Sequence, residues 1–189
     1  DLLMVTEKAT NNIDVFTVDN SGVASGPNVF PSAGQTPYGF AFGKRGQVFV
    51  SDAFGGAQNA GAMSSYSVSR AGALHTISGT VADNQSAPCW VVLTADGRYA
   101  YTTNTASGSV SSYWLGFDGE LNLLNSVAAN TGSGSGPVDA AVSNDSRFVY
   151  VLTPGASSIQ GFAIAVNGSL SPAGAVGNLP GSASGLIAR

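Results

Sequence analysis

Three segments of the chain, each opened by a proline, repeat at spacings of 51 and 49 residues. They read Pro37-Tyr-Gly-Phe-Ala-Phe, Pro88-Cys-Trp-Val-Val-Leu and Pro137-Val-Asp-Ala-Ala-Val. Each continues into a turn rich in Gly, Asp, Asn or Ser and then into a run of β-branched and aromatic residues. A period of about fifty residues with strand-like content is typical of a β-propeller, in which one repeat forms one four-stranded blade.

Four kinds of strand recur, and we name them a to d from the propeller axis outwards. Strand b is a continuous apolar run, as expected for a strand buried on both faces. Strand c alternates, as expected where one face is packed and the other meets solvent. No helical period is present. The predicted strands are a at Tyr38–Phe42, Trp90–Thr94 and Asp139–Ser143; b at Leu2–Thr6, Gln47–Ser51, Tyr99–Thr103 and Phe148–Leu152; c at Ile13–Val18 and Ile159–Ile164; and d at Leu74–Ile77, Leu121–Leu124 and Leu170–Ala173.

We predict four b strands but only three a–b turns, because the chain starts inside a strand b. Its end, Ala183–Arg189, reads as one more strand a. We therefore predict a single all-β domain of four blades in which this terminal strand completes the first blade and removes an open edge. Alternatively, these are four blades of a larger, seven-bladed ring. The predicted blades are 1–36 with 181–189, then 37–87, 88–136 and 137–180.

Composition excludes several classes of function. The net charge is −4 and no basic cluster occurs, so nucleic-acid binding has no electrostatic basis. No apolar run approaches the ~20 residues of a membrane helix. Cys89 is the only cysteine, so no internal disulfide can form. Scarce Lys and a surface of Ser, Thr, Asn and Gly favour a secreted or periplasmic protein.

The repeat is clearest between Pro88 and Asn104, where apolar positions, a turn, Gly-Arg and Tyr-Thr-Thr-Asn follow one another. This pattern resembles the YVTN-type propellers, and more specifically the seven-bladed lactonase-like family that includes bacterial 6-phosphogluconolactonase and fungal carboxymuconate lactonising enzyme. The resemblance covers the whole chain, and the Gly185–Arg189 ending is similar to the family's C-terminus. It implies that the chain corresponds to the C-terminal four blades of that family.

The resemblance also implies a reaction, the hydrolysis or formation of a lactone. In the family this chemistry uses His, Arg and Glu near the central channel, with His and Arg at the start of strand a. The matching pairs here contain neither His nor Arg, so no catalytic residue can be assigned in this chain. These pairs are Tyr38-Gly39, Cys89-Trp90, Val138-Asp139 and Ser184-Gly185.

Four residues at the starts of the a strands are the channel-facing candidates for ligand binding. Tyr38 and Trp90 could form an aromatic platform for a sugar ring, or could simply fill the axial end of their blades. Cys89 has no histidine to activate it, which favours an inert thiol. Asp139 is the best single candidate for a polar ligand or cation, but oxygen-rich metal sites need several ligands. We therefore predict neither a metal nor a cofactor.

Secondary candidates follow the b strands. Glu7, Asp52 and Asn104 share this position, and we expect Asx-type or capped turns there. His75, the only histidine, begins an outer strand and reads as an edge residue, not a general base. With one His and one Cys, a zinc site of the usual kind is excluded. The 55–61 loop, rich in glycine, is an insertion that could shape a binding mouth.

Three functions agree with these observations. The first is a lactonase-like propeller whose blades here supply channel wall and contacts to a small sugar-acid lactone. The second is a non-enzymatic propeller that presents its loops to a protein or carbohydrate partner. The third, a lectin-like module with one site per blade, is disfavoured because the aromatic positions differ between blades. A companion chain or a homodimer could complete a larger ring.

Overall fold

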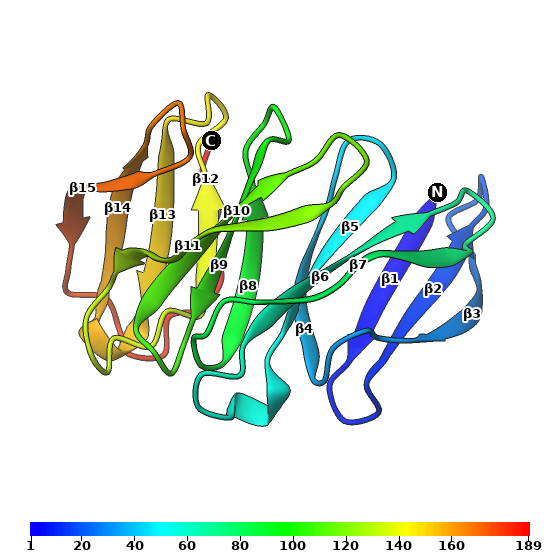
Figure 1. Ribbon diagram of the computed structural model, residues 1–189, viewed down its shortest axis with the longest axis horizontal. Helices are drawn as coiled ribbons and strands as arrows, with labels where there is room; N and C mark the ends of the chain where they lie inside the picture. Colours follow the sequence, from blue (N-terminus) through cyan, green and yellow to red (C-terminus); the bar gives the residue numbers. More distant parts are fainter.

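Four antiparallel sheets stand side by side in an arc (Figure 1). The structure is a computed structural model that describes all residues from Asp1 to Arg189. We call the sheets blades 1 to 4 in chain order. Their strands are β1 (Leu2–Glu7), β2 (Asn12–Val18) and β3 (Ala24–Pro31); β4 (Pro37–Phe42), β5 (Gln47–Asp52), β6 (Ala62–Val68) and β7 (Leu74–Ala82); β8 (Pro88–Leu93), β9 (Tyr99–Asn104), β10 (Ser109–Leu115) and β11 (Leu121–Asn130); and β12 (Asp139–Val142), β13 (Phe148–Thr153), β14 (Ser158–Ile164) and β15 (Leu170–Val176).

Within each blade the order of strands in the sheet is the order in the chain. The inner strands β4, β8 and β12 are neighbours along the arc, and the outer strands β7, β11 and β15 are neighbours on its other side. This confirms the predicted propeller architecture. The only helices are two single 3-10 turns, η1 (Phe54–Gly56) and η2 (Pro154–Ala156), and neither is long and apolar enough to cross a membrane.

The b strands of blades 2 and 3 are the most buried elements. All six residues of β5 and all six of β9 are buried, which explains their uninterrupted apolar character. Successive side chains of β5 point to opposite neighbours: Val48 and Val50 join the core shared with blade 1, whereas Phe49 joins the core shared with blade 3. The strands β5 and β9 therefore each contribute to two cores at once, whereas β1 and β13 each contribute to one.

One hydrophobic core lies at each of the three junctions between blades. Branched aliphatic side chains pack there against at least one fully buried aromatic ring, Tyr66, Tyr113 or Tyr101. Close packing of these side chains makes a rigid frame that holds the inner strands in place. The buried members are Met4, Ile13, Val15, Val48, Val50, Tyr66 and Leu74 between blades 1 and 2; Phe49, Met63, Val91, Ala100, Tyr113, Leu115 and Leu121 between blades 2 and 3; and Tyr99, Tyr101, Val110, Ala129, Ala140, Val149, Val151 and Phe162 between blades 3 and 4.

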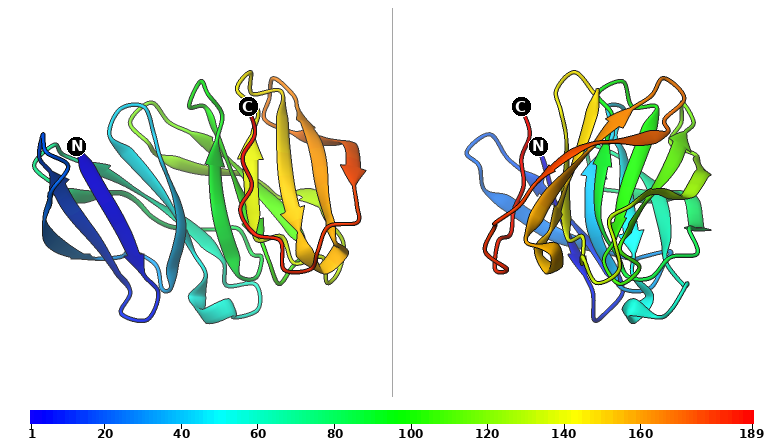
Figure 2. Two further views of the ribbon diagram at one scale, coloured as in Figure 1. Left: turned by 180° about the vertical axis from the view of Figure 1, so that it is seen from behind. Right: turned by 90° about the vertical axis from the view of Figure 1, so that its left-hand side faces the viewer.

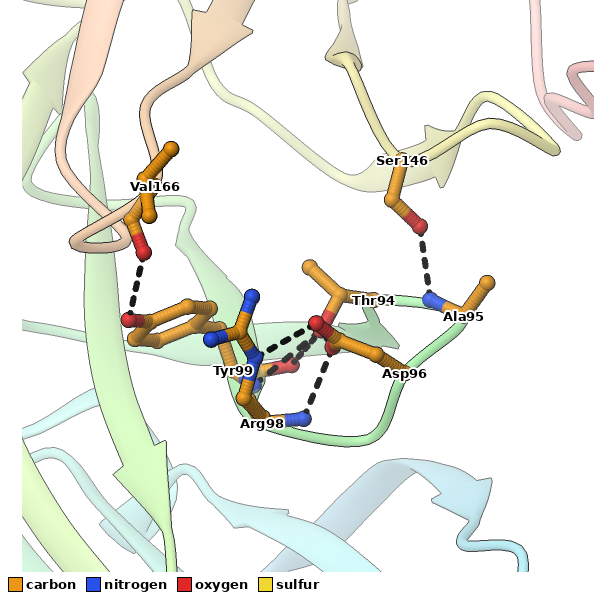
Figure 3. Close-up of polar contacts among 7 residues, drawn as sticks. All are labelled: Thr94, Ala95, Asp96, Arg98, Tyr99, Ser146 and Val166. Atoms are coloured by element: carbon orange, nitrogen blue, oxygen red, sulfur yellow. Dashed lines mark hydrogen bonds and ion pairs between the residues drawn. The ribbon is translucent and has the colours of Figure 1, made fainter.

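The a–b turn of blade 3 also fastens this blade to blade 4 (Figure 3). Asp96 accepts hydrogen bonds from the Thr94 hydroxyl (2.7 Å) and the Arg98 backbone N–H (3.0 Å), and its other oxygen pairs with Arg98 Nε at 2.6 Å. Burial raises the pKa of Asp96, but these bonds outweigh it and lower the pKa to about 2. Across the junction, the Ala95 N–H donates to the Ser146 hydroxyl (2.7 Å).

The predicted closure by the terminal strand is wrong for this structure. Blade 1 has three strands, and no strand pairs with β1 on its inner side. Residues 183–189 form no strand and run beside β12, where the Leu186 N–H donates to Asp139 Oδ2 at 2.8 Å (Figure 2). The physical reason is the shape of the arc, because β1 lies at the far end of the row of blades from β12. The structure has the other predicted arrangement, four consecutive blades of a larger ring.

Candidate ligand-binding site at the inner strands

The starts of the inner strands approach each other closely on the face of the propeller that carries the b–c turns. A Cβ atom on Gly39 would lie 2.2 Å from the Cys89 carbonyl oxygen and 2.9 Å from Trp90 Cα. Only glycine allows the two backbones to come this near. Tyr38 and Trp90 thus lie on neighbouring inner strands next to a tight backbone contact.

Hydroxyl groups hold the first residues of each inner strand from the preceding blade. In each case a Ser or Thr at or just after the end of a b strand donates to a carbonyl oxygen at the blade proline or the residue after it. Such bonds fix backbone position, so the candidate side chains rest on a rigid support. The pairs are Thr6 with Tyr38 (2.7 Å), Ser51 with Cys89 (3.0 Å) and Thr105 with Pro137 (2.7 Å).

Tyr38 and Trp90 form the accessible aromatic surface of this region. Their exposed fractions are 39% and 38%, so neither ring is a core residue, and the two rings do not stack on one another. Lys8, in the turn after β1, places its Nζ 5.2 Å from the centre of the Tyr38 ring. This distance allows a cation–π contact. An ammonium group and an exposed aromatic face therefore lie together at the start of β4.

Cys89 is half-buried beside the same group of residues. The Thr105 hydroxyl lies 2.8 Å from Cys89 Sγ, and it also donates to the Pro137 carbonyl oxygen. Burial is the main influence on the pKa of the Cys89 thiol and raises it above its ordinary value. A raised pKa keeps the thiol protonated near neutral pH, which does not suit a nucleophile. His75 is exposed at the start of β7, an outer strand.

Asp139 is 8% exposed, and both its carboxylate oxygens accept backbone hydrogen bonds. Oδ1 accepts from the Ala140 N–H at 2.7 Å, and Oδ2 accepts from the Leu186 N–H. Burial raises the pKa of Asp139, and these two bonds act against the rise. A ligand that binds Oδ2 would compete with the terminal segment for this oxygen. The structure contains no group of three or more His, Cys, Asp and Glu side chains that could hold a metal ion.

The two secondary candidates, Glu7 and Asp52, do share one register position with Asn104, the last residue of a b strand. Glu7 ends β1, Asp52 ends β5 and Asn104 ends β9. Glu7 accepts a hydrogen bond from the Thr10 hydroxyl, which caps its turn as predicted. Asn104 Nδ2 donates to Ser109 at 3.1 Å and to another serine of β10 at 2.8 Å.

Asp52 departs from this pattern. Its side chain is completely buried, and neither carboxylate oxygen makes a hydrogen bond of normal geometry, although the Ser64 hydroxyl stands near it and acts to lower its pKa. Two residues account for this: Ala62 stands where the Asn104 turn has Ser109, and the carboxylate lies against Gly34, where a Cβ would come within 2.2 Å of Asp52 Cγ. Burial raises the pKa of Asp52 to about 7. The expected capped turn is therefore absent at Asp52.

Lys8 and Thr105 were missed by the sequence reasoning. Each is the residue that directly follows a b strand, Lys8 after Glu7 and Thr105 after Asn104. The repeat itself contained the signal, because this position faces the inner strand of the next blade in both cases. Extending the alignment by one residue past strand b brings them to one position, but Ala53 and Pro154 share it, so residue type alone does not mark it.

A family model described as a lactonase, 7-bladed beta-propeller, matches residues 5–141. The chain belongs to this lactonase family. Among solved structures it is similar to a protein from Bacteroides uniformis assigned as a 6-phosphogluconolactonase (21% identity, TM-score 0.74, covering 92% of this chain and 54% of that one). It is similar to a protein of unknown function from Desulfotomaculum acetoxidans (19%, TM-score 0.74, covering 94% and 53%).

A third similar structure is the periplasmic gluconolactonase of Pseudomonas aeruginosa, with 21% identity and a TM-score of 0.61, covering 97% of this chain and 69% of that one. At these identities the likeness shows the fold alone. The lactonase-family chain spans about half the length of the first two structures. No curated protein matches it.

Proposed function

We propose that these blades form part of the channel wall of a lactonase-family propeller and contact a small sugar-acid lactone there. The acid–base groups come, on this proposal, from blades outside residues 1–189. The observation that carries it is the exposed pair of aromatic rings, Tyr38 and Trp90, with the Lys8 ammonium beside one of them. Aromatic faces suit the C–H surface of a sugar ring, and an ammonium group suits its acidic substituent.

The remaining groups of the site support contact but not catalysis. The Cys89 thiol has a raised pKa, and Asp139 is bound to backbone N–H groups. Neither offers the free acid or base, poised near neutral pH, that general acid–base catalysis needs. The same observations also fit the second function, a propeller that binds a carbohydrate without changing it.

Fluorescence can test binding, because the chain has two tryptophans and only Trp90 is in the site. In a Trp114→Phe background, Trp90 emission is titrated with 6-phosphogluconate and, separately, with neutral glucose. We expect a saturable change with the anionic sugar acid and a several-fold weaker affinity in Lys8→Ala, since an exposed charge contact is worth up to about 1 kcal/mol. Arg70→Ala, which removes a charge elsewhere, is the matched control.

The outcome separates the two functions. Equal affinity for glucose and 6-phosphogluconate, unchanged by Lys8→Ala, would favour the carbohydrate-binding propeller. No saturable response to either sugar would refute the assignment of this surface as a ligand contact.

A further inference from the structure

A cavity of about 230 Å³ lies between the a–b turns of blades 2 and 3. These turns are on the opposite face of the propeller from the b–c turns, and so at the far end of the inner strands from Tyr38 and Trp90 (Figure 1). The cavity is smaller than the roughly 300–1,000 Å³ of pockets that hold drug-sized ligands. It therefore suits a molecule of few atoms.

Part of the lining of this cavity is apolar. Phe49 and Leu115, from the core shared by blades 2 and 3, are buried, and Leu93 is partly buried. Phe42, at the end of β4, is 48% exposed and adds an accessible aromatic ring to the same lining. A ligand with an apolar ring can bury surface against these side chains and meet the Phe42 ring in a favourable aromatic contact.

The charged side chains of the lining are both cationic, Lys44 and Arg45. Neither forms an ion pair. Asp118 and Glu120, on the adjoining c–d hairpin, neither line the cavity nor pair with these cations. In a chain with a net charge of −4, two adjacent cations without an acidic partner give this cavity a local positive potential.

The corresponding turns of blades 3 and 4 carry their own counter-charge. Asp96 pairs with Arg98 at 2.6 Å, and Asp145 pairs with Arg147 at 2.5 Å. The turn of blade 2, residues 44–46, is one residue shorter than these two and contains no acid. A second cavity of about 190 Å³, between the turns of blades 3 and 4, is accordingly lined by both aspartates as well as by Arg98. A lining that carries only positive charge thus distinguishes the junction of blades 2 and 3 from the next junction.

Arg45 is held in place beside the cavity. Its guanidinium lies 3.9 Å from the centre of the Phe117 ring, and one of its N–H groups donates to the Phe117 carbonyl oxygen at 3.3 Å. The Gln47 side chain, 5% exposed, accepts the Arg45 backbone N–H at 3.0 Å and donates to the same carbonyl oxygen at 3.2 Å. A guanidinium has five N–H donors, so most of them stay available to an oxyanion.

The other side of the cavity is the a–b turn of blade 3, which contributes Thr94, Ala95 and Gly97. The hydrogen bonds that Asp96 accepts, and the bond from Ala95 to Ser146, fix this turn (Figure 3). Both sides of the cavity are therefore formed before a ligand arrives. A site that is already formed loses less conformational entropy on binding than one that must be ordered.

We propose that this cavity binds a small aromatic carboxylate. The carboxylate pairs with Arg45 and Lys44, and the ring packs on Phe42 and Leu93. Benzoate is the simplest anion of this kind and serves as the probe. The proposal does not depend on the lactone contact proposed above, because the two sites share no residue and lie at opposite ends of the inner strands.

Amide chemical shifts measured by NMR test the site in the whole chain. Benzoate is titrated, with benzyl alcohol as the neutral ring and acetate as the carboxylate without a ring. We expect saturable shifts of the Gly43, Gly97 and Gly116 amides, with a Kd on the order of 1 mM, the range open to a ligand of few atoms. Benzyl alcohol and acetate should each bind at least about fivefold more weakly. The Val166 amide, in the cavity between blades 3 and 4, is the internal control and should not shift.

Substitutions test the part played by charge. Lys44→Ala should weaken benzoate binding about three- to fivefold, and Lys44→Glu, which supplies the acid that the other turns have, at least about tenfold. Arg147→Ala, in the corresponding turn of blade 4 where the cation is already paired, is the matched control and should leave the Kd unchanged. Lys8→Ala, which affects the lactone contact, should also leave it unchanged, so the failure of one proposal is distinguishable from the failure of the other.

Three results would overturn the proposal. The first is the absence of saturable shifts up to about 20 mM benzoate. The second is binding of acetate or benzyl alcohol as tight as that of benzoate, and the third is an unchanged Kd in Lys44→Glu. Because Lys44 is exposed and forms no ion pair, its substitution should leave the fold intact, so weaker binding in these variants would not reflect unfolding.

Discussion

Replacing Asp52 with asparagine should make the stability of the protein less dependent on pH. The fold favours the neutral carboxyl group, because burial raises the pKa of Asp52 from 3.8 to about 7. A group with a raised pKa in the folded state contributes its full stability below the unfolded value, and this contribution is lost as pH rises through the folded value. Wild-type stability should therefore fall between about pH 4 and pH 7.

The size of the effect follows from the shift. A difference of about three pKa units at 1.36 kcal/mol each gives about 4 kcal/mol. The Asp52→Asn amide cannot ionise, so it avoids this loss, but it buries two N–H donors where the neutral carboxyl group buries one O–H, which costs about 1–3 kcal/mol more at every pH. We expect a net gain of about 1–3 kcal/mol at pH 8 and a loss of about 1–3 kcal/mol at pH 4.

Urea denaturation of both proteins at pH 4 and pH 8 measures this directly. The difference between variant and wild type should change by about 4 kcal/mol across that range, since other buried carboxyl groups affect both proteins alike. Asp118→Asn, which removes the same charge from an exposed turn, is the control and should show a change below about 0.5 kcal/mol. A constant difference between Asp52→Asn and wild type at both pH values would refute the reasoning.

Three further substitutions test packing, each by urea denaturation. Trp90→Ala should cost about 1–2 kcal/mol, less than the ~3–5 of a core aromatic, because the ring is 38% exposed; a larger loss would contradict its place in an open site. Gly168→Ala should cost more than about 2 kcal/mol, since φ is +79° and the new Cβ would lie 2.5 Å from the Tyr99 ring; a neutral result would refute this contact. Arg45→Ala should cost about 0.5–1 kcal/mol, because its guanidinium lies 3.9 Å above the Phe117 ring; Lys44→Ala, without such a ring contact, should be neutral.

The repeat allowed the strands and their order to be predicted, because strand character is local. The b strands were found to within one residue; for example, Gln47–Ser51 was predicted and β5 ends at Asp52. The outer strands were predicted too short: Leu121–Leu124 was expected, but β11 continues to Asn130. Its later residues mix polar with small apolar side chains and pair through a bulged register, which leaves no clear alternation to detect.

The terminal segment and Asp52 show which features of the fold cannot be predicted from a pattern of strands. Residues 183–189 have the composition of a strand a, but whether they meet β1 depends on the angle between successive blades, which no local pattern encodes. The isolation of Asp52 depends on Ala62 and Gly34, two small residues far apart in the sequence. In the candidate site, Tyr38, Cys89 and Trp90 do lie together, as the shared start of strand a implied. Asp139 instead holds the terminal segment.

Because β5 and β9 are each shared between two cores, the four blades are not equally supported against unfolding. Blades 2 and 3 are each held by two neighbours, whereas blades 1 and 4 are held by one. Residues 1–189 taken by themselves are then a short linear array in which stability propagates between nearest neighbours. A destabilising substitution in β5 weakens the junctions of blade 2 with both blade 1 and blade 3, whereas one in β1 weakens only the junction of blade 1 with blade 2. Under heat or mechanical load, opening should therefore begin at the outer blades and move inwards.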